Sequence, residues 1–260
     1  MDIANEYGTL QLQRYLLPML IDIDKVCREN DIEYSLSDGT LLGAVRHKGF
    51  IPWDDDIDLS FDRENFNRFM AAAEKSLPEQ YEIVYDTWIR RVTRKDNPKK
   101  HSFPPEGCID LFIFDKVPYN RKREKRQIFL LKTLQGMLKT NVIYEGFSVQ
   151  KKVMLFATHA LGKMFPQKLK QKWYDAVSQW GNRDQQANTV ARLNGSYSGI
   201  DQVRYPLEMI KSYTNLTFES KEYRSISGWK VFLTTMYGDY MKLPEENARR
   251  SDHEHIGLKE

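Results

Sequence analysis

The chain has 260 residues, with 39 basic and 36 acidic side chains and a formal net charge of +3. This near balance excludes a polycationic nucleic-acid binder, so we expect no nucleic-acid partner. With 41% hydrophobic and 12% aromatic residues, the chain can bury one sizeable core but not the cores of two large domains.

The cysteines and the hydropathy pattern are typical of a cytoplasmic protein. Cys27 and Cys108 lie in apolar surroundings without metal-type spacing, which predicts reduced thiols in the core. Residues 1–9 carry acids where a secretory signal would have a basic region. The best apolar run, 153–165, contains a histidine and a lysine and is too short to span a bilayer. We therefore expect a cytoplasmic protein, soluble or peripheral at the inner face of the membrane.

The first predicted elements form a scaffold around a small-residue turn. Apolar residues recur at three- and four-residue steps over 10–30, which predicts a helix, and Pro18 indicates a kink or a late helix start. A short strand is predicted at 33–36, and a helix at 41–47 follows the turn at 37–40. Backbone N–H groups after such a turn can hold a phosphate, but the same pattern is typical of an ordinary turn.

An acidic cluster enters the core after this turn. Asp54, Asp56 and Asp58 share one face if 54–61 is extended, while the apolar residues between and after them face inward. Carboxylates side by side repel one another unless a cation lies among them, and clustered Asp oxygens suit Mg²⁺ or Mn²⁺. The alternative, a solvated acidic turn, is disfavoured by the apolar residues on both sides. The sequence therefore predicts a metal site here.

The next stretch predicts a helix capped by Asp62 and then two strands, at 81–85 and 88–93. Residues 94–105 form a polar, proline-bounded segment with several basic side chains. We interpret this segment as a mobile edge over a site.

A second acidic position lies in the apolar run 107–115. Asp110 interrupts what otherwise looks like a buried strand, and a buried carboxylate needs a cationic or hydrogen-bonding partner. That partner is either the predicted metal site or an arginine elsewhere in the chain. Asp115 ends the run and is predicted to lie in a loop.

The segment that joins these features resembles a known family. Gly39-Thr40-Leu41-Leu42-Gly43, then Arg46-His47, then the run from Gly49 to Asp58 is similar to the signature of the LicD family, phosphocholine transferases of bacterial surface glycans. The resemblance implies a nucleotidyltransferase-like fold. In that fold Asp110 would be the third carboxylate, on the neighbouring strand.

The resemblance also implies roles for the residues around the acidic cluster. Asp56, Asp58 and Asp110 would be catalytic, and with Asp54 they would hold Mg²⁺ or Mn²⁺. The list of expected phosphate- or nucleotide-binding residues is Gly39, Thr40, Arg46 and His47. For the cations at the end of the short helix, a favourable interaction with the helix dipole is an alternative that requires no function.

The C-terminal stretch carries a second resemblance. The block 236–246, with a basic, histidine-containing tail, is similar to the end of LicD proteins. Aromatic rings near carboxylates suit a choline ammonium group, which makes Trp229, Tyr237 and Tyr240 candidate choline contacts. The alternative is that these rings are ordinary core residues. His253 and His255 are interpreted as tail residues without a metal.

Between these regions, 116–205 contains no motif that we can place. A helix is predicted over 124–139, and 148–177 mixes large apolar residues with lysines. That mixture is typical either of a basic amphipathic surface that rests on anionic lipid or of ordinary helices in a bundle.

We therefore expect an α/β fold with a nucleotidyltransferase-like mixed sheet core. Residues 1–115 would form the catalytic core, and a mainly helical region at 116–260 would complete the substrate site. The resemblance implies transfer of phosphocholine from CDP-choline to a sugar hydroxyl of a teichoic acid or lipopolysaccharide precursor, an acceptor that we expect to be lipid-linked. Alternatives are transfer of ribitol phosphate or of a nucleotide, or a non-catalytic module that binds cations or polyanions.

Overall fold

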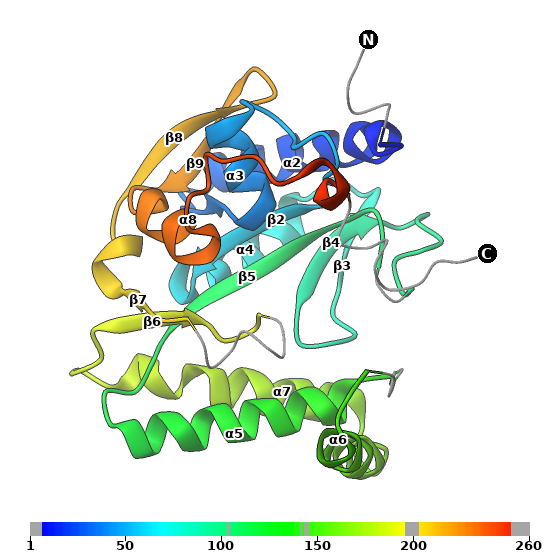
Figure 1. The fold of residues 1–260 in the computed structure, drawn as a ribbon, viewed down its shortest axis with the longest axis vertical. Helices are drawn as coiled ribbons and strands as arrows, with labels where there is room; N and C mark the ends of the chain where they lie inside the picture. The colour runs from blue at the N-terminus through cyan, green and yellow to red at the C-terminus, as the bar shows by residue number, and fades with distance from the viewer. Residues whose placement is uncertain (1–6, 103–104, 141, 143–145, 196–202, 251–260) are drawn as a thin grey trace. The chain divides into compact units, whose positions relative to one another are not determined.

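The computed structural model describes residues 7–102, 105–140, 142, 146–195 and 203–250, and it is a mixed α/β structure as predicted (Figure 1). His253 and His255 lie outside the described residues. The elements in chain order are α2 (Leu10–Glu29), β1 (Ser35–Leu36), α3 (Asp38–Arg46), β2 (Ile57–Asp62), α4 (Arg63–Ser76), β3 (Tyr81–Val84), β4 (Arg90–Arg94), β5 (Cys108–Lys116), α5 (Arg121–Leu138), α6 (Val149–Gly162), α7 (Gln167–Ser178), β6 (Thr189–Arg192), β7 (Tyr205–Pro206), β8 (Tyr213–Phe218), β9 (Lys221–Ile226) and α8 (Trp229–Tyr237).

The chain divides into two compact units. Unit 1 comprises Met1–Val84, Arg91–Phe112 and Glu208–Glu260, and unit 2 comprises Tyr85–Arg90 and Ile113–Leu207. The C-terminal residues thus belong to the same unit as the acidic cluster. The domain boundary that we expect at residue 115 stays a prediction, because compactness alone does not define a domain.

In unit 1 the sheet has the strand order β1-β2-β5-β4-β3. β1 and β2 are antiparallel, with Ser35 opposite Ser60, and β3 and β4 form an antiparallel hairpin with Tyr81 opposite Arg94. β5 therefore lies next to β2, so Asp110 stands on the strand beside the one that carries Asp58. This arrangement agrees with the expectation for the two strands.

Two helices complete the core of unit 1. α2 begins at Leu10, so Pro18 lies inside it and does not delay its start, and its face around Leu16, Leu20 and Ile23 is fully buried. α4 begins after Asp62, whose carboxylate accepts the backbone N–H of Asn65 at 2.7 Å, as the predicted N-cap requires.

The C-terminal part of unit 1 adds the β8–β9 hairpin and α8. The hairpin packs against β1, where the Ile226 N–H donates to Ser35 Oγ at 3.0 Å. Its two-residue turn has positive φ at Glu219 and Ser220, 47° and 63°, the conformation that reverses a two-residue hairpin. These strands were not anticipated in a region that we expected to be mainly helical.

Unit 2 contains the helices α5, α6 and α7 and the strands β6 and β7. α5 contacts both α6 and α7, and a buried cluster that includes Leu131, Leu138, Tyr174 and Leu193 fills its centre. The second half of β5 pairs with β6, with Phe114 opposite Arg192.

The prediction for Asp115 is wrong. It lies within β5, is fully buried, and accepts a hydrogen bond from Asn182 Nδ2 at 2.6 Å. A buried carboxylate needs such a partner, and the sequence gives no sign of an asparagine 67 residues away.

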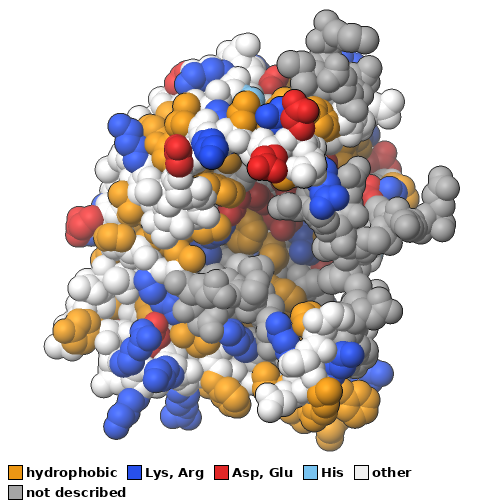
Figure 2. All heavy atoms as spheres, in the orientation of Figure 1, with side chains coloured by type: hydrophobic (Ala, Val, Ile, Leu, Met, Phe, Trp, Pro, Cys, Tyr) orange, Lys and Arg blue, Asp and Glu red, His pale blue; other side chains and the backbone are white. Residues whose placement is uncertain are grey.

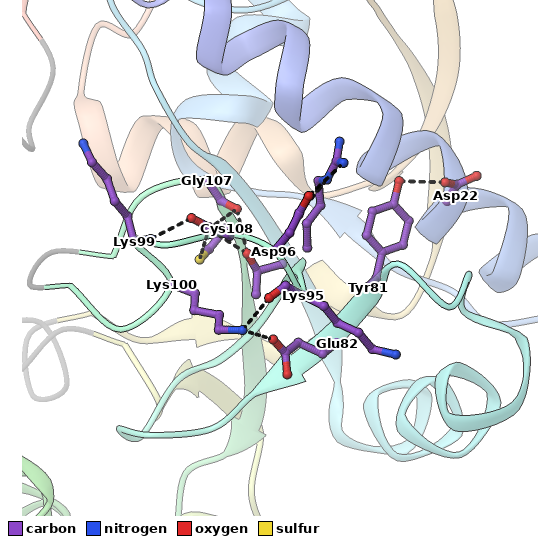
Figure 3. A network of polar contacts seen from close by, with 12 residues as sticks. Asp22, Tyr81, Glu82, Lys95, Asp96, Lys99, Lys100, Gly107 and Cys108 are labelled. Carbon is purple, nitrogen blue, oxygen red and sulfur yellow. Dashed lines mark hydrogen bonds and ion pairs between the residues drawn. The ribbon is translucent and has the colours of Figure 1, made fainter.

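A network of polar contacts holds the segment that follows β4 (Figure 3). The Lys99 ammonium pairs with Glu106 at 2.6 Å, Lys100 Nζ donates to the Lys95 carbonyl at 2.7 Å, and the buried Asn97 amide donates to Thr93 Oγ1 at 2.9 Å. We expected a mobile edge in this segment. These contacts link its described residues to one another and to β4, and the mobility of the segment stays a prediction.

Cys27 and Cys108 are free and buried, as predicted, and burial raises the pKa of the Cys27 thiol. Among the described residues, no helix combines the length and the apolar character that crossing a bilayer requires.

Candidate active site

Asp58 is the centre of the acidic cluster. Its side chain is 8% exposed, its backbone N–H donates to Thr40 Oγ1 at 2.9 Å, and its carbonyl accepts the Ser37 N–H at 2.9 Å. These two bonds join β2 to the turn that begins α3. The predicted separate turn at 37–40 is wrong, because α3 begins at Asp38 and Gly39 and Thr40 lie in its first turn, next to β2.

The surroundings of Asp58 are strongly acidic. Burial raises the pKa of the Asp58 carboxyl well above its ordinary value, and Asp56, Asp38, Asp110 and Asp54 each raise it further by repulsion. The structure thus brings together the four carboxylates that the sequence predicts for the metal site. Asp38, the first residue of α3, is an additional acid that the sequence analysis missed.

The strand itself begins later than expected. β2 starts at Ile57, so Asp54 and Asp56 precede the strand and do not owe their positions to strand parity. Asp54 instead lies against the start of α3, where its Oδ2 would come within 2.5 Å of a Cβ placed on Gly39. A side chain at position 39 would therefore require the Asp54 carboxylate to move.

Helix α2 positions the turn that carries Asp54. The Gln13 amide donates to the carbonyls of Asp54 at 2.8 Å and Ile51 at 3.2 Å, and the Thr9 hydroxyl donates to the Pro52 carbonyl at 2.6 Å. We interpreted this helix as scaffold without chemistry. The signal that could have identified its role is Gln13, a polar residue on an otherwise apolar buried face.

The donor set fits a hard divalent cation with a substrate present. Within the part of the chain that the structure describes, no three Asp, Glu, His or Cys side chains converge closely enough to hold a metal by themselves. Mg²⁺, however, is usually held by one or two carboxylates together with substrate phosphates, so a three-residue protein cage is not required. Burial and four neighbouring acids raise the pKa of Asp58 and so disfavour its charged form. A cation bound beside Asp58 would stabilise that charged form.

Asp110 has the arginine partner that the sequence analysis left as an alternative. Arg91 Nε on β4 lies 2.9 Å from Asp110 Oδ1, and the arginine side chain is buried. The two alternatives are not exclusive, since Asp110 also acts on the pKa of Asp58. Arg91 thus places a cation against one member of the acidic cluster, and nothing in its own sequence context indicates this role.

Arg46 contacts backbone carbonyls in this structure. Its Nη1 donates to the carbonyls of Tyr240 at 3.1 Å and Lys242 at 3.3 Å, which fixes the segment after α8 against the end of α3. Burial lowers the pKa of Arg46, and the nearby Arg249 lowers it further. We expected Arg46 to bind phosphate directly, and that role stays a prediction.

A cavity of about 570 Å³ in unit 1 unites the two stretches that carry the sequence resemblance. Five of the predicted site residues line it, and these are Gly39, Arg46, Asp54, Tyr237 and Tyr240. The sequence analysis missed Trp53, Asp239, Glu245 and Arg250, which line the same cavity. The three charged residues among these are ordinary surface types in sequence.

The other predicted site residues are not in this lining, and these are Thr40, His47, Asp56, Asp58, Asp110 and Trp229. The His47 ring packs edge-on against Trp53 with ring centroids 6.2 Å apart. Burial lowers the pKa of His47, and the positive charge of Arg46 lowers it further. The Trp229 ring packs edge-on against Tyr240 at 6.5 Å. His47 and Trp229 thus each pack against an aromatic ring that lines the cavity, and their predicted roles stay predictions.

A comparison with known families agrees with this site. Residues 31–133 match the family described as LicD/FKTN/FKRP, nucleotidyltransferase domain. Residues 31–133 are therefore similar to a LicD-family nucleotidyltransferase domain. The matched span includes every carboxylate of the acidic cluster, from Asp38 to Asp110, together with Arg91.

Individual relatives extend the match. The lipopolysaccharide cholinephosphotransferase LicD of Haemophilus influenzae is 28% identical over 264 residues, covering 94% of this chain and 96% of that protein. Uncharacterised proteins of Rickettsia typhi and Rickettsia prowazekii are 35% and 31% identical over 101 residues, 39% of this chain and 29% and 34% of theirs. The likeness to the Haemophilus protein therefore extends well beyond the span that matches the family.

The contact between Gly39 and Asp54 leads to a prediction. Gly39→Ala places a Cβ 2.5 Å from Asp54 Oδ2 and must push that carboxylate away from the start of α3. Because the Asp54 carboxylate is the end of a flexible side chain and can move, we expect a loss of stability of only about 1 kcal/mol. We expect its displacement to lower the transfer activity about 100-fold. Denaturant unfolding and a transfer assay would measure the two effects. A Gly39→Ala protein with wild-type activity would show that the position of Asp54 does not matter.

Proposed function

We propose that this protein transfers phosphocholine from CDP-choline to a hydroxyl group of a lipopolysaccharide precursor. The observation that carries the proposal is the cavity in which Gly39, Arg46 and Asp54 meet Tyr237 and Tyr240. The proposed site for a phosphate-containing donor would thereby adjoin the proposed site for its head group. The end-to-end likeness to a lipopolysaccharide cholinephosphotransferase supports the choice of reaction.

The cavity lining suits a quaternary ammonium group. Trp53, Tyr237 and Tyr240 offer aromatic faces, and Asp54, Asp239 and Glu245 add negative charge. A trimethylammonium group is attracted by ring faces and by nearby carboxylates, and it cannot donate hydrogen bonds. The combination of aromatic rings and negative charge favours choline over ribitol, which carries no positive charge.

The acidic cluster would perform the phosphoryl chemistry. Asp56 and Asp58 would hold Mg²⁺ or Mn²⁺, which neutralises charge on the phosphates when it is bound. Asp54 stands next to them at the start of α3, and Arg46 and Arg250 line the cavity as cations for phosphate oxygens. Asp110, held by Arg91, would position the attacking hydroxyl.

The reaction is a displacement at the phosphorus atom of phosphocholine. The acceptor oxygen forms a new bond to phosphorus, the bond from phosphorus to the CMP oxygen breaks, and CMP leaves with that electron pair. The hydroxyl proton passes to a carboxylate or to solvent. The residues of the chain contribute alignment and charge stabilisation, which supply most of the rate enhancement in phosphoryl transfer.

Calorimetric titration tests the donor and the site together. Wild type should bind CDP-choline in Mg²⁺ and not in EDTA, and the double variant Asp56→Ala/Asp58→Ala should not bind it in either condition. CDP-ribitol and CTP serve as competitors and should displace CDP-choline poorly. Preferred binding of either competitor would keep the site and remove the choline assignment.

The head-group site has its own matched variants. Tyr240→Phe keeps a ring face and should bind CDP-choline nearly as well as wild type, whereas Tyr240→Ala should bind about tenfold more weakly. Tyr119→Ala, at an exposed tyrosine of unit 2, is the control. Equal binding by all three variants would contradict an aromatic choline site.

A further inference from the structure

Helix α6 presents its apolar side chains to solvent. Within α6 only Leu155 and Gly162 are buried, an unusual pattern for a helix of a folded unit. The large apolar residues of α6 and the turn after it are exposed as follows: Val149 75%, Val153 62%, Met154 54%, Phe156 64%, Leu161 42% and Met164 74%. We call these six residues the α6 apolar face.

The contact between α6 and α5 explains why this face points outward. A Cβ on Gly162 would lie 2.3 Å from the Met137 carbonyl oxygen, and one on Gly136 would lie 2.2 Å from Thr158 Oγ1. The two helices therefore meet through glycines and a threonine, and this contact has no room for large side chains. At 100° per residue, the bulky residues fall on the arc of α6 that faces away from α5.

The same part of unit 2 is strongly basic. Residues 121–173 contain 13 Lys and Arg against 2 Glu and no Asp, a difference of 11 positive charges in a chain whose total is +3. Figure 2 shows basic side chains over α5 and hydrophobic side chains gathered at α6. Lys151 and Lys152 are both exposed, and Lys152 borders the α6 apolar face, whereas Lys151 lies on the arc toward α5. An apolar face of this size, bordered by cations, is typical of an interaction surface.

We propose that the α6 apolar face inserts into the interface of a lipid bilayer that contains anionic lipids. Amphipathic helices with aliphatic and Phe side chains on one face and lysines beside them bind such interfaces, with the apolar side chains below the headgroups. The lysine stems lie along the same surface and place their ammonium groups at the lipid phosphates. Phe147, whose ring lies 4.5 Å from the Lys151 ammonium, extends the pattern beyond the start of α6.

Charge complementarity selects this occupant over the others. A symmetric contact with a second copy would place two basic regions against each other and would repel. A nucleic acid would match the charge but would not bury the exposed Val, Met and Leu side chains. Proteins contact nucleic acids mainly through cationic and aromatic side chains. An anionic bilayer satisfies both the charge and the apolar face.

The inference does not rest on the proposed function, because it concerns unit 2 and a lipid surface without substrate. It is tested by sedimentation of the full chain with phosphatidylcholine vesicles, with and without phosphatidylglycerol. Wild type should sediment with the anionic vesicles and should be released by high salt. No donor or acceptor is present in this assay, so its failure leaves phosphocholine transfer unaffected.

Two variants and one control give the test its sharpness. Val153→Asp should weaken vesicle binding about tenfold, because it replaces an inserting side chain by a charge. Lys151→Gln/Lys152→Gln should weaken binding to anionic vesicles and flatten its salt dependence. Val231→Asp, at an exposed valine of α8, should bind as wild type does. Circular dichroism and thermal unfolding should match wild type in all of these proteins, since the substituted side chains are exposed.

The opposite results would overturn the proposal. Failure of wild type to bind anionic vesicles would do so, as would equal binding by Val153→Asp and Val231→Asp. Self-association that Val153→Asp abolishes, without vesicle binding by wild type, would assign the α6 apolar face to a second copy instead.

Discussion

Asp58→Asn is expected to abolish phosphocholine transfer and, at the same time, to make the metal-free protein more stable. The Asp58 carboxyl is buried among four other carboxylates, so its charge is opposed both by burial and by repulsion. Asparagine has nearly the same shape and no charge. We expect activity to fall at least about 10³-fold and the free energy of unfolding in EDTA to rise on the order of 1 kcal/mol.

The pH dependence of stability should follow the direction of the pKa shift. The folded state holds the Asp58 proton more tightly than the unfolded state, because the folded pKa is raised well above the ordinary value of 3.8. Wild type should therefore lose stability relative to Asp58→Asn as the pH rises above 3.8, and the two proteins should converge below it. Thermal unfolding in EDTA across this range measures the difference. Added Mg²⁺ should raise the melting temperature of wild type more than that of the variant.

Asp115→Asn is the matched control for this experiment. Asp115 is also a buried aspartate of the sheet, but Asn182 satisfies it and it lies in unit 2. Its replacement should lower stability, since an amide cannot reproduce the charge-assisted hydrogen bond. If Asp58→Asn lowered stability as much as Asp115→Asn, Asp58 would be an ordinary structural carboxylate. That result would contradict the proposed metal site.

The sequence was sufficient to predict which residues form the acidic cluster, but not how the backbone positions them. The short spacing of Asp54, Asp56 and Asp58 between apolar residues was sufficient to predict an acidic cluster at the edge of a buried strand, because covalent connection alone keeps these groups together. The same spacing could not show that β2 begins only at Ile57. The position of Asp54 depends on Gln13 and Gly39, contacts that only the tertiary structure creates.

The C-terminal block shows the same division. A run of tyrosines near acids indicates a site for a cationic head group, and Tyr237 and Tyr240 do line the cavity. Nothing in the sequence pairs this block with α3, some 190 residues earlier, because that contact is made by Arg46 with backbone carbonyls. Backbone carbonyls are present at every residue, so a contact of this kind leaves no pattern in a single sequence.

The buried pair of Arg91 and Asp110 leads to the second large prediction. Arg91→Met keeps the length and packing of the stem but leaves the Asp110 carboxylate beside Asp58 without the arginine's charge. Breaking a fully buried pair in this way costs about 3–5 kcal/mol. Because the Asp110 side chain is 26% exposed, solvent screens part of the effect, and we expect a loss of about 2 kcal/mol.

A double variant separates structure from chemistry at this pair. Arg91→Met/Asp110→Asn removes both charges, so it should recover most of the stability that Arg91→Met loses, and denaturant unfolding of the four proteins in the cycle measures this coupling. Its transfer activity should nevertheless stay at least about 100-fold below wild type, because the carboxylate that positions the acceptor hydroxyl is absent. A stable double variant with wild-type activity would show instead that Asp110 serves only to neutralise Arg91. In that case the catalytic carboxylates would be confined to the segment before β2 and to the first residues of β2. Asp58 would remain among them, because its burial and its neighbouring acids favour the binding of a cation beside it.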